Sequence, residues 1–156
     1  MACRAHDTSP VSGIAYVMHW STQFIGTEYQ EFGRDRTGCD CWGLVYVVFR
    51  DQLDITLPTY SGLYASAEER SEISALISNA AISAVWQRVD SDFQDFDIAV
   101  FRRGRMDAHV GIVIAPNLML HMANEDCAKI ERFDQAAWKN RLTGIYRHFK
   151  LPSKVA

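Results

Sequence analysis

The sequence predicts an α+β fold in which helices come first and an antiparallel sheet follows. Up to about residue 86, apolar residues recur at helical spacing within long segments. From residue 95 onward they fall into short runs separated by turn residues, which predicts short strands. A chain of 156 residues can bury one core without metal ions or disulfides, so we expect a single domain over 1–156 with tails at 1–11 and 150–156.

Composition and charge exclude several classes of function. The net charge of −3 argues against a dedicated nucleic-acid-binding protein, which usually carries a basic excess. No apolar run approaches the roughly 20 residues that a membrane-spanning helix needs. The N-terminus lacks the apolar segment of a secretory signal, so we expect synthesis in the cytoplasm without a signal peptide.

Two helices are predicted outside the central motif. Residues 12–26 place apolar side chains at helical intervals, and Gly26 is a natural end. Ser66 and Glu69 form a capping box before an apolar stripe that continues to about Trp86. The polar segment 27–38 between the first helix and the central motif is predicted to be a loop.

The central motif, CWGLVYVVFRDQ over residues 41–52, is ambiguous. Its β-branched and aromatic residues favour a strand. Its length and two adjacent apolar rows at helical spacing favour a buried helix instead. We predict a helix whose first turn contains Cys41.

The second half of the chain predicts five strands. The turn formed by APN at 115–117 predicts a tight hairpin between the two strands that carry His109 and His121. The five strands are predicted at 97–103, 108–115, 118–123, 127–133 and 143–151.

The cysteines are Cys3, Cys39, Cys41 and Cys127. Their spacing does not match the paired ligands of structural zinc sites, and a chain of this size has little need of disulfides. Metal binding and disulfide formation therefore stay open as minor alternatives. Most of the four are expected to be small buried side chains.

Cys41 differs because of the helix that it opens. The positive end of a helix dipole and the unpaired N–H groups there lower the pKa of a thiol and favour its nucleophilic form. A cysteine nucleophile also needs a nearby histidine and a group that orients it. His109 and His121 are candidates if the hairpin brings them onto one face, although a histidine in an apolar strand is more often a core residue.

The ordered motifs GCDCWGLVYVVF, ITLP, DFDIAVF and HVGIVIAPNLMLH resemble the NlpC-type, papain-like cysteine peptidases that cut bacterial cell-wall peptides. In that family an Asp-Cys-Ser-Gly-Leu-Val motif opens a helix, and a His-Val-Gly-Ile strand is followed twelve positions later by a third polar residue. Here twelve positions separate His109 from His121. The resemblance implies a papain-like NlpC fold, with the nucleophile at a helix N-terminus packed on the sheet, and no metal or organic cofactor.

The resemblance also implies roles for individual residues. Cys41 would be the nucleophile, His109 the general base and later acid, and His121 the orienting group. Asp40 would recognise the free amine of a stem peptide, although it could equally be only the N-cap of the helix. Tyr29 would lie near the substrate subsite, with plain packing as its alternative.

Trp42 departs from the family pattern, because serine usually follows the cysteine. It occupies a position that helps to line the substrate site.

The Asp-Cys-Trp-Gly-Leu form resembles the branch found in phage tails and gene-transfer particles. This implies tail-tip, hub or tape-measure proteins as partners, assembly into a tail, and action at the cell wall or periplasm. The alternatives are an inactive tail-tip protein whose groove is filled by Trp42, and an antibacterial effector.

Overall fold

A computed structural model of the chain describes residues 18–59, 85–123 and 126–152. The elements, in chain order, are η1 (Trp20–Phe24), β1 (Arg34–Asp35), β2 (Gly38–Cys39), α1 (Cys41–Leu53), β3 (Trp86–Val89), β4 (Ile98–Arg103), β5 (Met106–Ala115), β6 (Leu118–Met122), β7 (Ala128–Arg132), α3 (Ala136–Lys139) and β8 (Leu142–His148). The predicted α+β class is confirmed.

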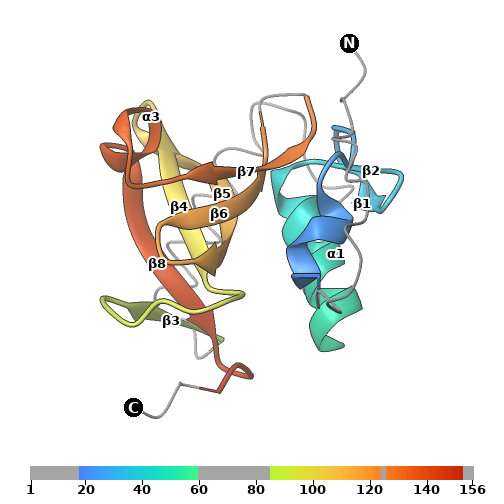
Figure 1. The fold of residues 1–156 in the computed structure, drawn as a ribbon, viewed down its shortest axis with the longest axis horizontal. Helices are drawn as coiled ribbons and strands as arrows, with labels where there is room; N and C mark the ends of the chain where they lie inside the picture. The colour runs from blue at the N-terminus through green and yellow to red at the C-terminus, as the bar shows by residue number, and fades with distance from the viewer. Residues whose placement is uncertain (1–17, 60–84, 124–125, 153–156) are drawn as a thin grey trace, which may run out of the picture.

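The main sheet has six antiparallel strands in the order β3-β8-β4-β5-β6-β7. Figure 1 shows α1 on one side of this sheet and α3 on the other side, at the top left of the view. β5 and β6 form the predicted tight hairpin, and Asn117 in its turn takes a left-handed φ of 64°. This hairpin is the part of the fold that positions both candidate histidines.

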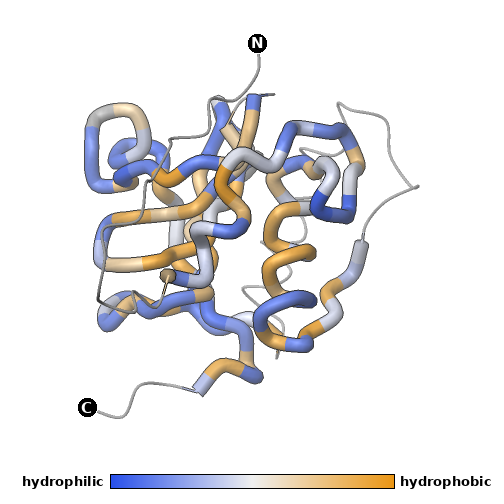
Figure 2. The backbone as a smooth tube through the Cα atoms, turned by 45° about the vertical axis from the view of Figure 1, so that its right-hand side comes forward, coloured by the Kyte–Doolittle hydropathy of each residue, from blue (hydrophilic) through white to orange (hydrophobic). Residues whose placement is uncertain are grey.

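The central motif forms the helix α1, as predicted, despite its strand-favouring residues. The Asp40 side chain caps the first turn by accepting from the Gly43 N–H, and Asp54 ends the helix in a left-handed conformation. The helix buries apolar side chains around most of its circumference, so packing outweighs local strand preference. Figure 2 shows a mostly hydrophobic α1 beside strands in which hydrophobic and hydrophilic segments are mixed. In the described part of the chain, no helix is long and apolar enough to cross a membrane.

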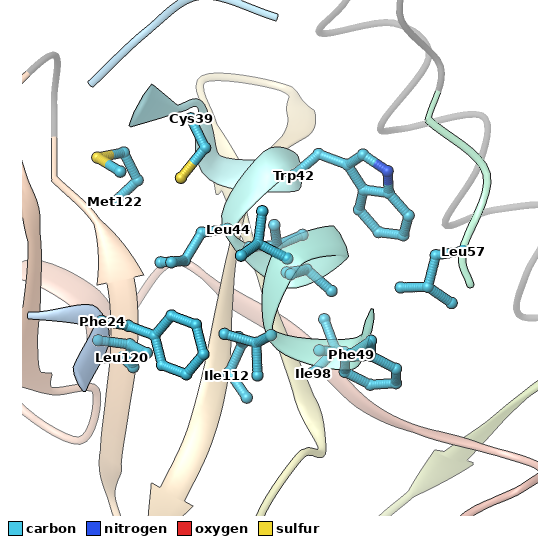
Figure 3. Close-up of a cluster of buried hydrophobic side chains, with 14 of the residues drawn as sticks. Phe24, Cys39, Trp42, Leu44, Phe49, Leu57, Ile98, Ile112, Leu120 and Met122 are labelled. Carbon is cyan, nitrogen blue, oxygen red and sulfur yellow. The ribbon is translucent and has the colours of Figure 1, made fainter. Parts of the chain in front are cut away.

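Apolar side chains pack on both faces of the sheet. One cluster fills the space between α1 and the sheet, where Leu44 and Phe49 of the helix meet Ile112 and Leu120 of the hairpin (Figure 3). A smaller cluster lies on the other face and includes Phe101, Met119 and Trp138. Alternation along β5 and β6 therefore assigns each hairpin side chain to one of two different environments.

Two predicted helices differ from the structure where it can be compared. Within 12–26, the described residues form only the short 3-10 helix η1, and Gly26 lies in a turn with a φ of 86°. The predicted helix from residue 66 lies almost entirely outside the described residues. Its predicted end at Trp86 is wrong, because Trp86 begins β3 and pairs with His148 of β8. A bulky apolar residue such as Trp86 is compatible with the end of a helix or with the start of a strand. Its pairing with β8 makes it part of a strand.

Candidate active site

Cys41 is the first residue of α1, directly after the capping Asp40. Cys41 is not part of a disulfide bond, and its side chain is partly exposed. α1 packs against β5 and β6, the two strands that carry the candidate histidines. The helix start thus gives Cys41 the electrostatic setting predicted for a nucleophile.

Asp40 is buried and fully engaged with the protein. Its Oδ1 accepts from the Gly43 N–H at 2.6 Å and from Arg34 Nη1 at 2.8 Å. Its Oδ2 accepts from the Phe32 N–H at 3.0 Å. The N-cap role is therefore confirmed, while contact with a substrate amine stays a prediction.

Arg34 and two glycines complete this network. Arg34 Nη1 also donates to the Gly33 carbonyl, and its Nε donates to the Thr59 carbonyl. A Cβ atom at Gly43 would collide with the Gly33 carbonyl oxygen, so the helix start and the preceding loop approach too closely for any side chain. The loop therefore holds the first turn of α1 at a fixed position.

His109 and His121 lie side by side on the β5–β6 hairpin. His109 Nε2 is 3.0 Å from His121 Nδ1, and the two rings meet edge to face. Register pairs His109 with Phe101 and His121 with Gly111, so both histidines point to the face that carries Phe101 and Trp138. The prediction that the hairpin brings the two side chains onto one face is confirmed.

Glu131 and Trp138 join the histidine pair, and neither was predicted. Glu131 Oε2 is 3.2 Å from His121 Nε2 and accepts the indole N–H of Trp138 at 2.8 Å. The Trp138 ring stacks on His109 with centroids 5.0 Å apart. An acidic residue on the strand directly after the predicted hairpin was the available signal, but the register of that strand against His121 cannot be deduced from spacing.

Both histidines are held in the neutral form. Burial, followed by His121 and the nearby charges of Arg141 and Arg103, lowers the pKa of His109 to about 3. Burial also lowers the pKa of His121, although Glu131 opposes that shift. A general base must start in the unprotonated form, and a neutral imidazole meets this requirement because it can accept a proton.

Tyr29 and Trp42 occupy different surroundings. Tyr29 is partly buried and its backbone bridges to Cys39, next to the start of α1. Trp42 is only 5% exposed, lies beside Leu57 in Figure 3, and donates its indole N–H to the Pro58 carbonyl. The buried indole gives no support to a Trp42 that fills the substrate groove. Direct substrate contact by either residue stays a prediction.

The remaining cysteines differ from Cys41. Cys39 is fully buried, and burial followed by the charge of Asp40 raises the pKa of its thiol to about 12. Cys127 is buried, as expected of most of these cysteines, but it is disulfide-bonded rather than free. Within the described ranges, no group of three or more His, Cys, Asp or Glu side chains is arranged to hold a metal ion.

A cysteine at the start of a helix and a histidine hairpin in an antiparallel sheet are the architecture of the papain-like fold. The chain belongs to the NlpC/P60 family, whose model matches residues 26–147. Among curated relatives, the murein DD-endopeptidase MepS/murein LD-carboxypeptidase of Escherichia coli (strain K12) is 27% identical over 125 residues. That alignment covers 80% of this chain and 57% of the relative, so the chain spans little more than half of the relative's length.

Solved structures of the same family share the fold. An NlpC/P60 family protein from Bacillus cereus ATCC 10987 has a TM-score of 0.61 at 20% identity, with 82% of this chain and 37% of that chain covered. The NlpC/p60 domain of the peptidoglycan hydrolase SagA has a TM-score of 0.54 at 17% identity, with 81% and 92% covered. These similarities confirm the papain-like NlpC fold predicted from the motifs.

Proposed function

We propose that this protein is a cysteine peptidase that hydrolyses an amide bond in the stem peptides of peptidoglycan. The observation that carries the proposal is a cysteine at the capped start of α1 together with a hydrogen-bonded His109–His121 pair on β5 and β6, the two strands that α1 contacts through their other face. Membership of the NlpC/P60 family and the murein endopeptidase among its relatives support the substrate class.

In the proposed mechanism, Cys41 Sγ attacks the carbonyl carbon of the scissile amide while its proton passes to His109. A carbon–sulfur bond forms, and the carbonyl electrons move onto the oxygen, which the positive end of α1 stabilises. Collapse of this intermediate breaks the carbon–nitrogen bond, and His109 returns the proton to the leaving amine. Water, deprotonated by His109, then hydrolyses the thioester and regenerates the thiol. His121 orients His109 throughout.

Substrate recognition is proposed for the surface around the start of α1. Tyr29 lies beside this turn and is proposed to flank the bound stem peptide. Asp40 is proposed to fix the position of this surface, because it accepts hydrogen bonds from the Phe32 N–H and from Arg34.

Digestion of purified peptidoglycan tests the substrate class. Soluble products are separated and identified by mass spectrometry after incubation with the wild-type protein. We expect fragments that carry a new amine and a new carboxylate within the stem peptide. Products cut only in the glycan strand, or no products at all, would exclude the proposed activity.

We further propose that the peptidase works as part of a phage or prophage tail, where it contacts tail-tip, hub or tape-measure proteins and opens the cell wall. The support is the Asp40-Cys41-Trp42-Gly43-Leu44 form of the motif, which resembles the tail branch. Protein mass spectrometry of induced, purified particles tests this assignment. Detection only in the cytoplasm would contradict it, and toxicity in the periplasm relieved by an adjacent immunity protein would favour an effector.

A further inference from the structure

Glu131 is a carboxylate whose two oxygens are both engaged beside the histidine pair. Oε2 lies against His121 Nε2 and the Trp138 indole, and Oε1 lies 3.3 Å from the ammonium group of Lys129. Burial acts to raise the pKa of Glu131, but the bond from Trp138 together with His121 and Lys129 outweighs it and leaves the pKa below its ordinary value. Glu131 is therefore ionised at neutral pH.

An ionised carboxylate can only accept hydrogen bonds. The nitrogen of His121 that faces Glu131, Nε2, must therefore carry the proton. Because neutral histidine has one protonated ring nitrogen, His121 Nδ1 is left as an acceptor. His109 Nε2, 3.0 Å away from it, must then be the donor, and His109 keeps its own Nδ1 unprotonated.

Trp138 holds this chain of hydrogen bonds in one geometry. Its indole N–H occupies Glu131 Oε2 at 2.8 Å, while its ring stacks on His109 and meets His121 edge-on. One side chain thereby fixes both ends of the three-residue chain. Rotation of either imidazole would break a hydrogen bond and a ring contact together.

We propose that Glu131 is a positioning residue which, acting through His121, fixes the tautomer of His109 that leaves Nδ1 free to take the Cys41 proton. The tautomer is set in the resting protein, and its use in catalysis rests on the proposed function. When His109 becomes positively charged during the reaction, its Nε2–H still donates toward His121, and the Glu131 carboxylate stabilises the charge through the same chain. Glu131 thus orients His121, and His121 in turn orients His109.

The test compares two variants of nearly equal size. Glu131→Leu removes both acceptor oxygens, whereas Glu131→Gln keeps an oxygen that can accept from His121 and Trp138. Nitrogen-15 NMR of the imidazoles in the resting protein, without substrate, reads the tautomers directly. We expect Nε2–H on both histidines in the wild type and in Glu131→Gln, and a loss of this pattern in Glu131→Leu.

Kinetics provide the second measurement. We expect kcat/KM for peptidoglycan fragments to fall about 10- to 100-fold in Glu131→Leu and by only a few-fold in Glu131→Gln. The pH profile for alkylation of Cys41 should shift in the leucine variant alone, which a merely structural loss of stability would not cause. The wild-type spectrum alone determines the tautomer of His109. The inference therefore stays testable even if the leucine variant does not fold.

Two outcomes overturn the inference. One is a wild-type His109 protonated on Nδ1. The other is a folded Glu131→Leu protein with unchanged tautomers and an unchanged pH profile. Failure of the proposed function is a separate result, because it would appear as absent hydrolysis by a wild-type protein whose imidazoles still show the expected tautomers.

Discussion

Arg34 Nη1 donates a hydrogen bond to Asp40 Oδ1 across 2.8 Å, and the two side chains are only 12% and 4% exposed. This pair neutralises the carboxylate that precedes Cys41 and ties the loop before α1 to the helix start. Asp40 is thereby already occupied by the protein's own donors. Its main effect on function is expected to be the placement of Cys41.

Substitution of Asp40 distinguishes its structural role at the start of α1 from direct recognition of the substrate. Asp40→Ala should lower the free energy of unfolding by about 3 kcal/mol, because it removes a helix cap and leaves the Arg34 charge without its partner. Asp40→Asn keeps one capping oxygen and should cost less. Denaturant unfolding measures both variants, and a cycle with Arg34→Met should show strong coupling. A stable Asp40→Asn protein with a raised KM for substrates with a free amine would instead favour direct recognition.

Trp42 is expected to matter for stability and little for activity. Trp42→Ser, which introduces the usual family residue, should lower the free energy of unfolding by about 4 kcal/mol because it empties a buried site. Trp42→Phe should cost about 1–2 kcal/mol, since most of the packing remains and only the bond to Pro58 is lost. Thermal unfolding and peptidoglycan digestion measure the two effects. A large rise in activity for Trp42→Phe would contradict this account and favour a blocked groove.

Thiol labelling should distinguish the two cysteines of the motif. Cys39 is buried with a pKa raised to about 12, so it has almost no thiolate at neutral pH. Cys41 is partly exposed at the start of α1. Brief treatment of the folded protein with iodoacetamide, followed by peptide mapping, should find modification at Cys41 and not at Cys39. Equal labelling of both would show that the surroundings of the two thiols differ less than the structure indicates.

His148 should make stability fall in acid. Burial, followed by the charge of Lys150, lowers its pKa below the ordinary value of 6.5. As the pH falls from 6.5 through this lowered pKa, the unfolded chain binds a proton that the folded protein resists, so stability decreases by up to about 1.4 kcal/mol per pH unit. His148→Asn keeps an acceptor for the Lys150 N–H and should show a shallower slope in unfolding experiments between pH 7 and 5. Parallel slopes for the two proteins would rule His148 out as the cause.

Local patterns predicted the parts of the molecule that local interactions control. The Asp40 cap and two apolar rows were enough for α1, and the turn before Leu118 was enough for the β5–β6 hairpin. Trp86 was assigned to the wrong kind of element because its partner, His148, lies 62 positions away in sequence. Pairings between distant segments leave no periodic signal at the residue itself.

Residues of the candidate site also differ in whether local sequence could predict their contacts. His109 and His121 could be paired from sequence because a short turn joins their strands. Glu131 could not, since its contact with His121 depends on the register of the next strand and on an indole supplied by α3. The side of α1 on which Trp42 is buried depends on the segment around Pro58, which spacing alone does not place.

The most direct test of the central claim is digestion of purified peptidoglycan by three proteins: the wild type, Cys41→Ala and the matched control Cys39→Ala. If Cys41 is the nucleophile, its alanine variant should release no cleaved stem peptides, while the Cys39 variant keeps activity within a few-fold of wild type. Circular dichroism of the variants confirms that each is folded. Release of the same products by Cys41→Ala and the wild type would contradict the account.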